Sequence, residues 1–418
     1  MKLQNMWTTL QSYRLEDHRF PTMVENVALL LRTMTVNIYK DNNAKRVSWF
    51  YYVIIFVTGI CYIYVYVFSM LWMLIVRYRS TKNYTAMAAA MSLTFCNITC
   101  ITKFLFMLVH IKRIRITVEK FLNYDAKIVP GTRFSKNLSK FLRVVKKRAL
   151  SIWLFLVTNG IVYIIIPFLK PGRNLTVNLY ILYGLEPMLE TPHYEIAHVV
   201  TTIAVVFCVY LMVNVAVYVI VMIGYNEAQI NTLSEEVNNL WGDSQNFYNS
   251  LKHKIKDKKY SIYIKEIIVN EYIRIRLKDI INYHVTNIHF FHELNHEFSD
   301  TLAIEYVIMA MAIIAELLGG LEITYLQIPY TVVQLYMDCL SGQRLIDACR
   351  GFEEALYGCK WESFNASNQR TILLMLLISQ KTLLLSAGGM ANLNFECLMM
   401  IFKSSYSVYT ALKSRLQH

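Results

Sequence analysis

Residues 47–76 form a run of 30 positions without a charged side chain. About 20 consecutive apolar residues are enough for a helix to cross the hydrocarbon core of a bilayer. This run therefore predicts a membrane-spanning helix. The composition agrees, because 55% of the residues are hydrophobic and only 17% are charged, whereas soluble proteins carry about 25% charged residues.

Further apolar stretches predict an all-α, seven-transmembrane fold. Spans two to six are expected at residues 84–110, 150–169, 197–224, 302–321 and 325–340. The last region, from residue 371 onward, is ambiguous, because hydropathy alone allows it to hold one span or two. Polar side chains inside a span are costly unless they face water or a partner. Those inside the predicted spans include Lys103, Glu305, Glu316, Gln334 and Asp338.

Basic residues predict the side of the membrane on which each loop lies, because cytoplasmic loops carry the excess of Lys and Arg. Alternate segments hold 33 and five of them. The rich segments are 1–46, 111–148, 225–300 and 341–381. The N-terminus is therefore expected in the cytoplasm and, with seven spans, the C-terminus outside. Asn83 and Asn174 begin sequons in two predicted outside loops, which makes them candidate glycosylation sites.

The chain is expected to form one structural domain. Residues 1–46 form a cytoplasmic segment with an amphipathic helix at 24–39, and residues 47–321 hold spans one to five. Within 225–300, apolar side chains recur at helical spacing between charged ones. A helix with such a stripe outside the bilayer must bury it, which predicts a cytoplasmic helical anchor bundle. Residues 322–418 complete the domain.

One catalytic pattern is present. His292, Glu293 and His296 match the H-E-x-x-H arrangement, in which two His side chains bind zinc and the Glu acts as a general base. The motif is short, and the further elements of zinc peptidases are missing. A polar helix face at the membrane boundary explains the residues more simply, so we expect no catalytic residue, metal or cofactor. A multi-pass zinc peptidase is the weaker alternative.

The outer halves of spans two, three, four and six are rich in aromatic and small polar residues. An apolar cavity with a few hydrogen-bonding groups suits a small, mainly hydrophobic ligand. Taken singly, most of these positions are explained by helix packing, but as a group they favour a ligand pocket. The candidate ligand-binding residues are Met91, Phe95, Thr158, Asn159, Tyr163, Thr202, Val206, Tyr210, Tyr330, Val333 and Gln334.

The C-terminal region carries a distinctive pattern: Ala387-Gly388-Gly389, then Glu396, then Lys403-Ser404-Ser405-Tyr406-Ser407. This pattern resembles the C-terminal signature of insect odorant receptors, from which Asn392, Asn394 and Phe395 depart. The chain length, the predicted topology and the long segment between spans four and five also resemble that family. The family's co-receptor lacks the Lys-x-Ser-Tyr-Ser ending, so the chain resembles a ligand-specific subunit.

The resemblance implies an odorant-gated, non-selective cation channel in which four subunits each give their last helix to a central pore. It implies a small volatile organic ligand, and a heterotetramer with the odorant receptor co-receptor in the plasma membrane of sensory-neuron dendrites. It also implies a cytoplasmic anchor helix at 371–386 and a pore-lining seventh span at 390–412. A G-protein-coupled or gustatory-type chemoreceptor is the alternative.

The net charge of +13 fits orientation in the membrane and contact with anionic lipid, so nucleic-acid binding is not expected.

Polar side chains recur on one face of the last span. A water-filled pore would satisfy them, and the alternative is that Lys403 reaches the membrane interface while the serines bond to their own helix. Four copies of Lys403 around one narrow pore would repel cations, which favours assembly with subunits that lack this lysine. The candidate pore residues are Met400, Lys403, Ser404, Ser407 and Thr410.

Overall fold

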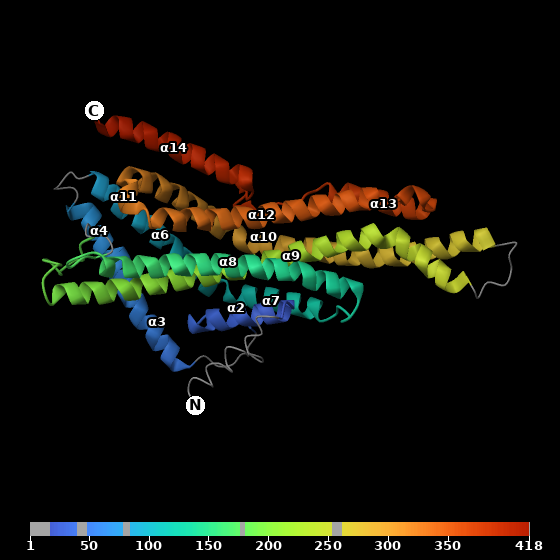
Figure 1. Cartoon of the computed structure of the whole chain (residues 1–418), viewed down its shortest axis with the longest axis horizontal. Coiled ribbons are helices and arrows are strands. Elements are labelled where there is room, and N and C mark those ends of the chain that lie inside the picture. Colours follow the sequence, from blue (N-terminus) through green and yellow to red (C-terminus); the bar gives the residue numbers. More distant parts are fainter. Residues whose placement is uncertain (1–16, 40–47, 78–83, 176–179, 253–260, 418) are drawn as a thin grey trace.

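The computed structural model describes residues 17–39, 48–77, 84–175, 180–252 and 261–417 (Figure 1). These residues are almost entirely helical, which confirms the all-α prediction. The first elements are α2 (Phe20–Thr33), α3 (Trp49–Tyr62), the π-helical η1 (Ile63–Ser69), α4 (Met70–Trp72), the π-helical η2 (Met73–Arg77), α6 (Tyr84–Val109) and α7 (Ile111–Asp125). Then follow α8 (Arg133–Leu169), α9 (His193–Leu251), α10 (Ser261–Gly319), α11 (Leu321–Thr324), α12 (Gln327–Gly358), η4 (Trp361–Ser363), α13 (Ala366–Ser379), β1 (Ser386–Ala387), β2 (Ala391–Asn392) and α14 (Phe395–Gln417).

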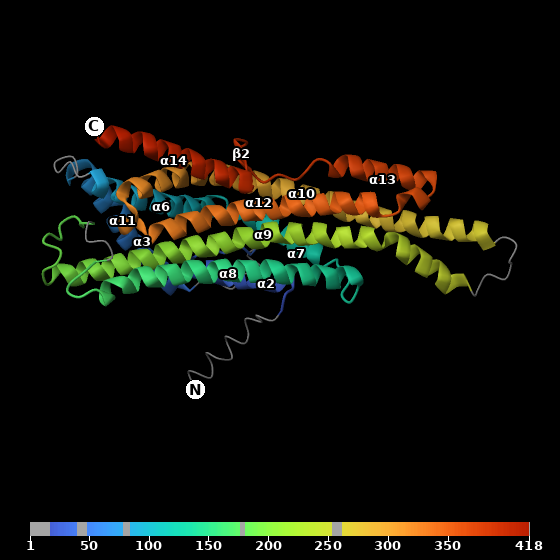
Figure 2. The same ribbon diagram turned by 45° about the horizontal axis from the view of Figure 1, so that its top comes forward.

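The long helices α8, α9, α10 and α12 lie side by side along the length of the molecule (Figures 1 and 2). Helix α9 is central, since it packs against α8, α10, α12, α3 and α2. At 59 residues it is about 90 Å long, far more than the roughly 30 Å that a bilayer core requires. The predicted segment 225–300 thus consists largely of helical extensions of two spans.

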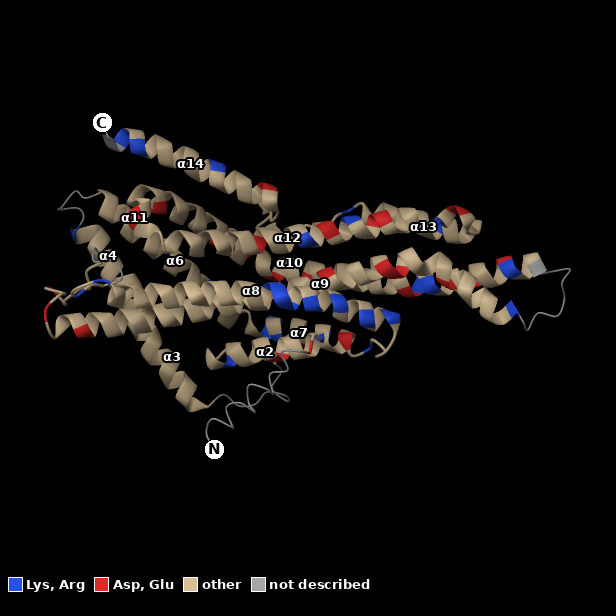
Figure 3. Ribbon diagram, viewed as in Figure 1, with Lys and Arg blue, Asp and Glu red and all other residues tan. Residues whose placement is uncertain are grey.

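Charged residues divide the bundle into two halves. Figure 3 shows Lys, Arg, Asp and Glu crowded in the half that contains α7, α13 and the facing ends of α9 and α10. Five helical segments are long and apolar enough to cross a membrane: Trp49–Arg77, Tyr84–Val109, Arg133–Leu169, His193–Leu251 and Ile262–Gly319. The first five predicted spans lie on these segments. The predicted sixth and seventh spans lie on α12 and α14, which carry more polar side chains.

The charged half has a packed core of its own. His284 on α10 is 8% exposed, and its ring centroid lies 4.5 Å from that of Phe352 on α12. Burial lowers the pKa of His284 to about 4. Glu236 on α9 is buried and pairs with Arg133 of α8 and Arg276 of α10, each at 2.7 Å. These contacts join the helical extensions into one body.

The Ala-Gly-Gly motif forms the turn of a short hairpin before the last helix. Gly388 and Gly389 have φ angles of +59° and +69°, values that favour glycine because it has no Cβ. The Gly388 N–H donates to the backbone oxygen of Ser299 at 3.0 Å, and a Cβ at Gly388 would lie 2.8 Å from the Cβ of Ala303. The turn therefore fixes the start of α14 against α10.

Helix α13 begins and ends earlier than the predicted anchor helix, and α14 begins after residue 390 and continues beyond 412. Helix α2 buries its apolar face, including Phe20, Val24 and Val27, against the bundle.

The charged groups inside the spans are paired with one another. Lys103 on α6 and Glu305 on α10 form an ion pair of 2.7 Å, with side chains 7% and 1% exposed. Gln334 on α12 donates to the same carboxylate at 3.4 Å, and Asp338 is buried beside it. Near the C-terminal end of α10, the Glu316 carboxylate accepts a hydrogen bond from the Thr331 hydroxyl at 2.6 Å.

Breaking the Lys103–Glu305 pair on one side only is expected to destabilise the protein. Lys103→Met or Glu305→Leu leaves a buried charge without its partner, which costs about 3–5 kcal/mol. The double variant removes both charges and is expected to regain most of that loss. Thermal unfolding of the purified full chain measures the effect.

The exposed pair of Lys120 and Glu293, with side chains 48% and 39% exposed, supplies the control. Lys120→Met is expected to change stability by less than about 1 kcal/mol. Equal losses from the buried and the exposed replacement would contradict the prediction.

Candidate functional site

A cavity of about 70 Å³ lies within the apolar half of the bundle. Its walls come from η1, α6, α8, α9 and the start of α12, and most of its lining side chains are apolar or aromatic. The lining residues are Tyr66, Leu93, Cys96, Asn97, Asn159, Gly160, Tyr163, Val205, Cys208, Val209, Leu326, Gln327 and Tyr330. The mostly apolar lining with a few polar groups is typical of a small-molecule site, although at about 70 Å³ the cavity is smaller than the sites of drug-sized ligands.

Hydrogen bonds fix the start of α12 against the other walls. The Asn159 amide of α8 donates to the Leu326 oxygen at 3.2 Å. The Gln327 side chain accepts from the Ser92 hydroxyl of α6 at 2.6 Å and donates to the Tyr180 hydroxyl at 3.0 Å. These polar side chains hold the helices together and leave a mostly apolar surface toward the cavity.

A close approach of α8 to α9 shapes another wall. Gly160 faces Val209, and a Cβ added at Gly160 would lie 2.9 Å from the Val209 Cγ1. The absence of a side chain at Gly160 therefore allows the two helices to meet beside the cavity.

The structure brings three of the predicted ligand-binding residues together, since Asn159, Tyr163 and Tyr330 all line this cavity. Helical spacing could not have indicated Asn97, Cys96 and Gln327, which line it too. In a hydropathy profile Asn97 and Gln327 count only as polar positions within a span, and Cys96 counts as one of many apolar positions.

The other predicted ligand-binding residues lie elsewhere. Thr158 and Val206 are exposed on the outside of the bundle, and Thr202 and Val333 are half-buried without lining the cavity. The Tyr210 hydroxyl lies 2.7 Å from that of Thr33 on α2. Gln334 belongs to the polar cluster around Glu305. Met91 and Phe95 face a second hollow.

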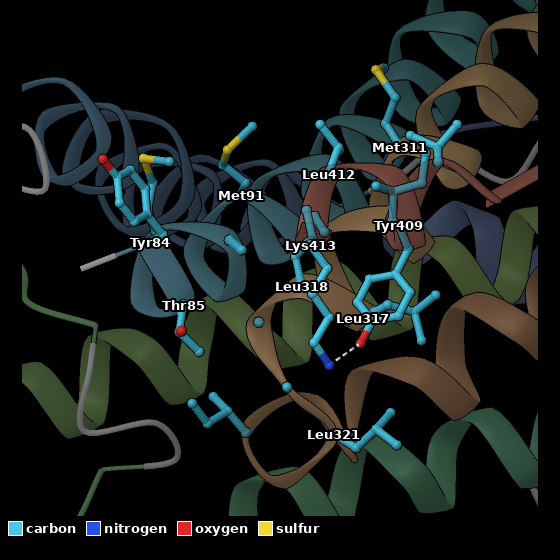
Figure 4. A pocket seen from close by; sticks show the side chains of 18 of the residues that line it. Tyr84, Thr85, Met91, Met311, Leu317, Leu318, Leu321, Tyr409, Leu412 and Lys413 are labelled. Atoms are coloured by element: carbon cyan, nitrogen blue, oxygen red, sulfur yellow. Dashed lines mark hydrogen bonds between the residues drawn. The ribbon is translucent and has the colours of Figure 1, made fainter. Parts of the chain in front are cut away.

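This second hollow is an open groove of about 1370 Å³ between α14 and the body of the bundle. Figure 4 shows Met91, Met311 and Leu321 of the body together with Tyr409, Leu412 and Lys413 of α14. The groove exists because α14 contacts α10 and α12 but stands away from the body toward its C-terminal end (Figure 1). Its walls include well-exposed side chains such as Tyr84 and Leu321.

The candidate pore residues lie on the uncovered side of α14. Met400, Lys403, Ser404, Ser407 and Thr410 are all exposed in the single chain, whereas Ser405 is buried. The Thr410 hydroxyl donates to the Ser407 backbone oxygen at 2.8 Å. Because these five side chains are exposed in the single chain, the polar stripe is available to water or to another subunit.

The residues of the H-E-x-x-H motif do not form a metal site. His292 and His296 are exposed, and Glu293 pairs with Lys120 at 2.6 Å. The described part of the chain contains no group of three or more His, Cys, Asp or Glu residues that could hold a metal ion.

Of the two candidate glycosylation sites, Asn174 lies in the loop after α8, where its amide donates to the Pro171 oxygen at 2.9 Å. Asn83 lies outside the described residues.

A family model described as 7tm Odorant receptor matches residues 83–406. The chain belongs to this odorant receptor family. Membership makes it a receptor rather than an enzyme, so the zinc peptidase alternative is wrong. A search of curated protein sequences gave no match.

Solved structures of an insect olfactory receptor share the fold of this odorant receptor. OR5 from Machilis hrabei matches with a TM-score of 0.70 and 12% sequence identity over 93% of this chain and 97% of that chain. The structure of OR5 in complex with eugenol matches with a TM-score of 0.68 and 13% identity over 94% and 97%. This likeness confirms the seven-transmembrane helical fold.

Crowding the α8–α9 contact is expected to destabilise this receptor. Gly160→Ala places a methyl group against Val209, and overpacking of this kind costs about 1–3 kcal/mol. Adding Val209→Ala makes room and is expected to restore much of the stability. Gly242→Ala on α9 is the control, because no atom lies within 4 Å of its added Cβ. Thermal unfolding measures all four proteins, and equal stability of the two Gly→Ala single variants would contradict the expectation.

Proposed function

We propose that this odorant receptor is a ligand-specific subunit of a ligand-gated, non-selective cation channel. The observation that carries the proposal is the cavity among the membrane-spanning helices, lined mainly by apolar and aromatic side chains. A small, volatile, mainly hydrophobic ligand suits such a cavity. Membership of the odorant receptor family and the similarity to a receptor solved with eugenol support it.

The ligand would contact Asn159, Tyr163 and Tyr330, three of the side chains that line the cavity. Met91 and Phe95 lie instead in the groove beside α14, where a ligand would contact the last helix directly. The cavity is the better candidate because several of its lining side chains, such as Tyr66 and Gln327, are buried.

Helix α12 is suited to connect the cavity with the last helix. Tyr330 lines the cavity near the start of α12. Further along the same helix, the Tyr336 ring stacks on Phe395 of α14 at a centroid distance of 6.0 Å, and the Gln343 side chain accepts from the Phe395 N–H at 3.5 Å. A ligand that binds one position of α12 better than another shifts the equilibrium toward it, and α14 would move with it.

In this proposal, the polar stripe of α14 lines one wall of a central tetrameric pore. Met400, Lys403, Ser404, Ser407 and Thr410 would face water there, which removes the cost of polar groups in a membrane. Lys403 in four copies would oppose cation passage, so we propose that the chain assembles with the co-receptor in a heterotetramer. The N-terminus would lie in the cytoplasm of a sensory-neuron dendrite, and Asn83 and Asn174 would face the outside.

Cells that express this chain together with the co-receptor are expected to give a rapid cation current when volatile compounds are applied. Cells with either subunit alone, tested with the same panel, are the control. The current is expected to persist when G proteins are blocked, because the channel itself carries it. A response that requires G proteins, or a C-terminal tag that is accessible only from the cytoplasm, would favour a G-protein-coupled receptor instead.

Neutralising Lys403 is expected to raise cation conductance. If the side chain faces the pore, Lys403→Gln removes a positive charge from the ion path and increases the single-channel cation current by roughly threefold. Lys413→Gln is the matched control, because the Lys413 ammonium lies on the same helix and donates to the Tyr409 hydroxyl at 2.9 Å. Equal currents from the wild type and both variants would place Lys403 away from the pore.

A further inference from the structure

We infer that the cavity lined by Asn97 and Tyr330 selects ligands that carry a hydroxyl group, with the Asn97 oxygen accepting a hydrogen bond from this group and Tyr330 donating one to its oxygen. The inference rests on the proposed function of this cavity as the ligand site. It adds the chemical class of the ligand and two side chains that determine it.

Asn97 on α6 presents an acceptor that the protein leaves unpaired. The residue is 4% exposed and lines the cavity. Its amide nitrogen donates to the Leu93 backbone oxygen at 2.6 Å, while its Oδ1 is buried and has no hydrogen-bond partner within the described chain. Because a backbone oxygen only accepts, the nitrogen must face Leu93, and this fixes the oxygen as the free end of the amide.

Tyr330 on α12 supplies the second group. Its side chain lines the same cavity from another helix, and its buried hydroxyl has no hydrogen-bond partner among the described residues. A phenol hydroxyl can donate one hydrogen bond and accept others. Buried polar groups are almost always paired in folded proteins, so two unpaired groups in one cavity point to an occupant that pairs them.

Two neighbouring polar side chains are already engaged. The Asn159 amide donates to Leu326, and the Gln327 side chain bonds both Ser92 and Tyr180. These bonds hold the helices in place, whereas Asn97 and Tyr330 each keep a buried oxygen that is unpaired within the described chain.

The two groups distinguish ligands by their hydrogen-bonding capacity. An alcohol or phenol donates to the Asn97 oxygen and accepts from the Tyr330 hydroxyl. An ether of the same size accepts from Tyr330 but has no proton for Asn97, and a hydrocarbon pairs with neither. Each lost bond leaves a buried polar group unsatisfied, which corresponds to about a tenfold loss of affinity.

Isomeric ligand pairs test this directly. The probes are 1-hexanol with methyl pentyl ether, and benzyl alcohol with anisole, because the two members of each pair have the same atoms and nearly the same size. Binding to the purified full chain is measured by the ligand-dependent shift in thermal unfolding over a concentration series. The alcohols are expected to bind about tenfold more tightly than their ether isomers.

Two variants separate the roles of the side chains. Asn97→Leu is expected to weaken alcohol binding about tenfold and leave ether binding unchanged, which abolishes the preference. Tyr330→Phe is expected to weaken binding of both members of each pair. Matched controls lie far from the cavity: Asn239→Leu removes a similar amide bond to the Glu235 oxygen, and Tyr357→Phe changes a side chain that is 72% exposed on the same helix as Tyr330.

Equal affinity for alcohols and ethers in the wild type would overturn the inference, and so would an Asn97→Leu variant that shifts both members of every pair by the same factor. The second result would mean that an ordered water pairs the two groups. In either case, odour-evoked current in cells would still support the proposed receptor function. Absence of both binding and current for every volatile would instead contradict the proposed function itself.

Discussion

The ion pair between Lys103 and Glu305 constrains the packing of the apolar half of this receptor. A charge in a low-dielectric interior is stable only beside an opposite charge or a set of hydrogen bonds. The 2.7 Å contact therefore sets the relative depth of α6 and α10, because sliding either helix by one turn would separate the charges. Gln334 of α12 donates a hydrogen bond to the same carboxylate. This bond also sets the position of α12 along α10.

Once α12 is placed, the cavity and the last helix are placed as well. The start of α12 closes the cavity through Tyr330 and Gln327, and its middle part contacts the start of α14 through Tyr336 and Phe395. The helices around the cavity are held by hydrogen bonds and by the tight contact at Gly160, so the space between them is small and defined. A rigid apolar cavity with two unpaired polar groups can discriminate between ligands of equal size by their hydrogen-bonding capacity.

The candidate site could be predicted only in part, for a reason particular to membranes. In a soluble protein the apolar face of a helix reveals which side is buried, but lipid and protein interior are both apolar. Hydropathy therefore placed Met91 and Asn159 in one group, although Met91 faces the groove beside α14 and Asn159 faces the cavity. The sequence did not predict that Asn97 lines the cavity, because a single amide within a span gives no sign of what it faces.

The sequence by itself determined the helical class, the positions of the first five spans and the glycines of the turn before the last helix. Long uncharged runs must form helices to pair their backbone groups in a bilayer, and the turn at Gly388 and Gly389 requires φ values that suit glycine. The rotation and crossing of the helices were decided only in the tertiary structure. They depend on contacts between residues far apart in the chain, such as Lys103 with Glu305 and Gly160 with Val209, and these contacts decide which side chains line the cavity.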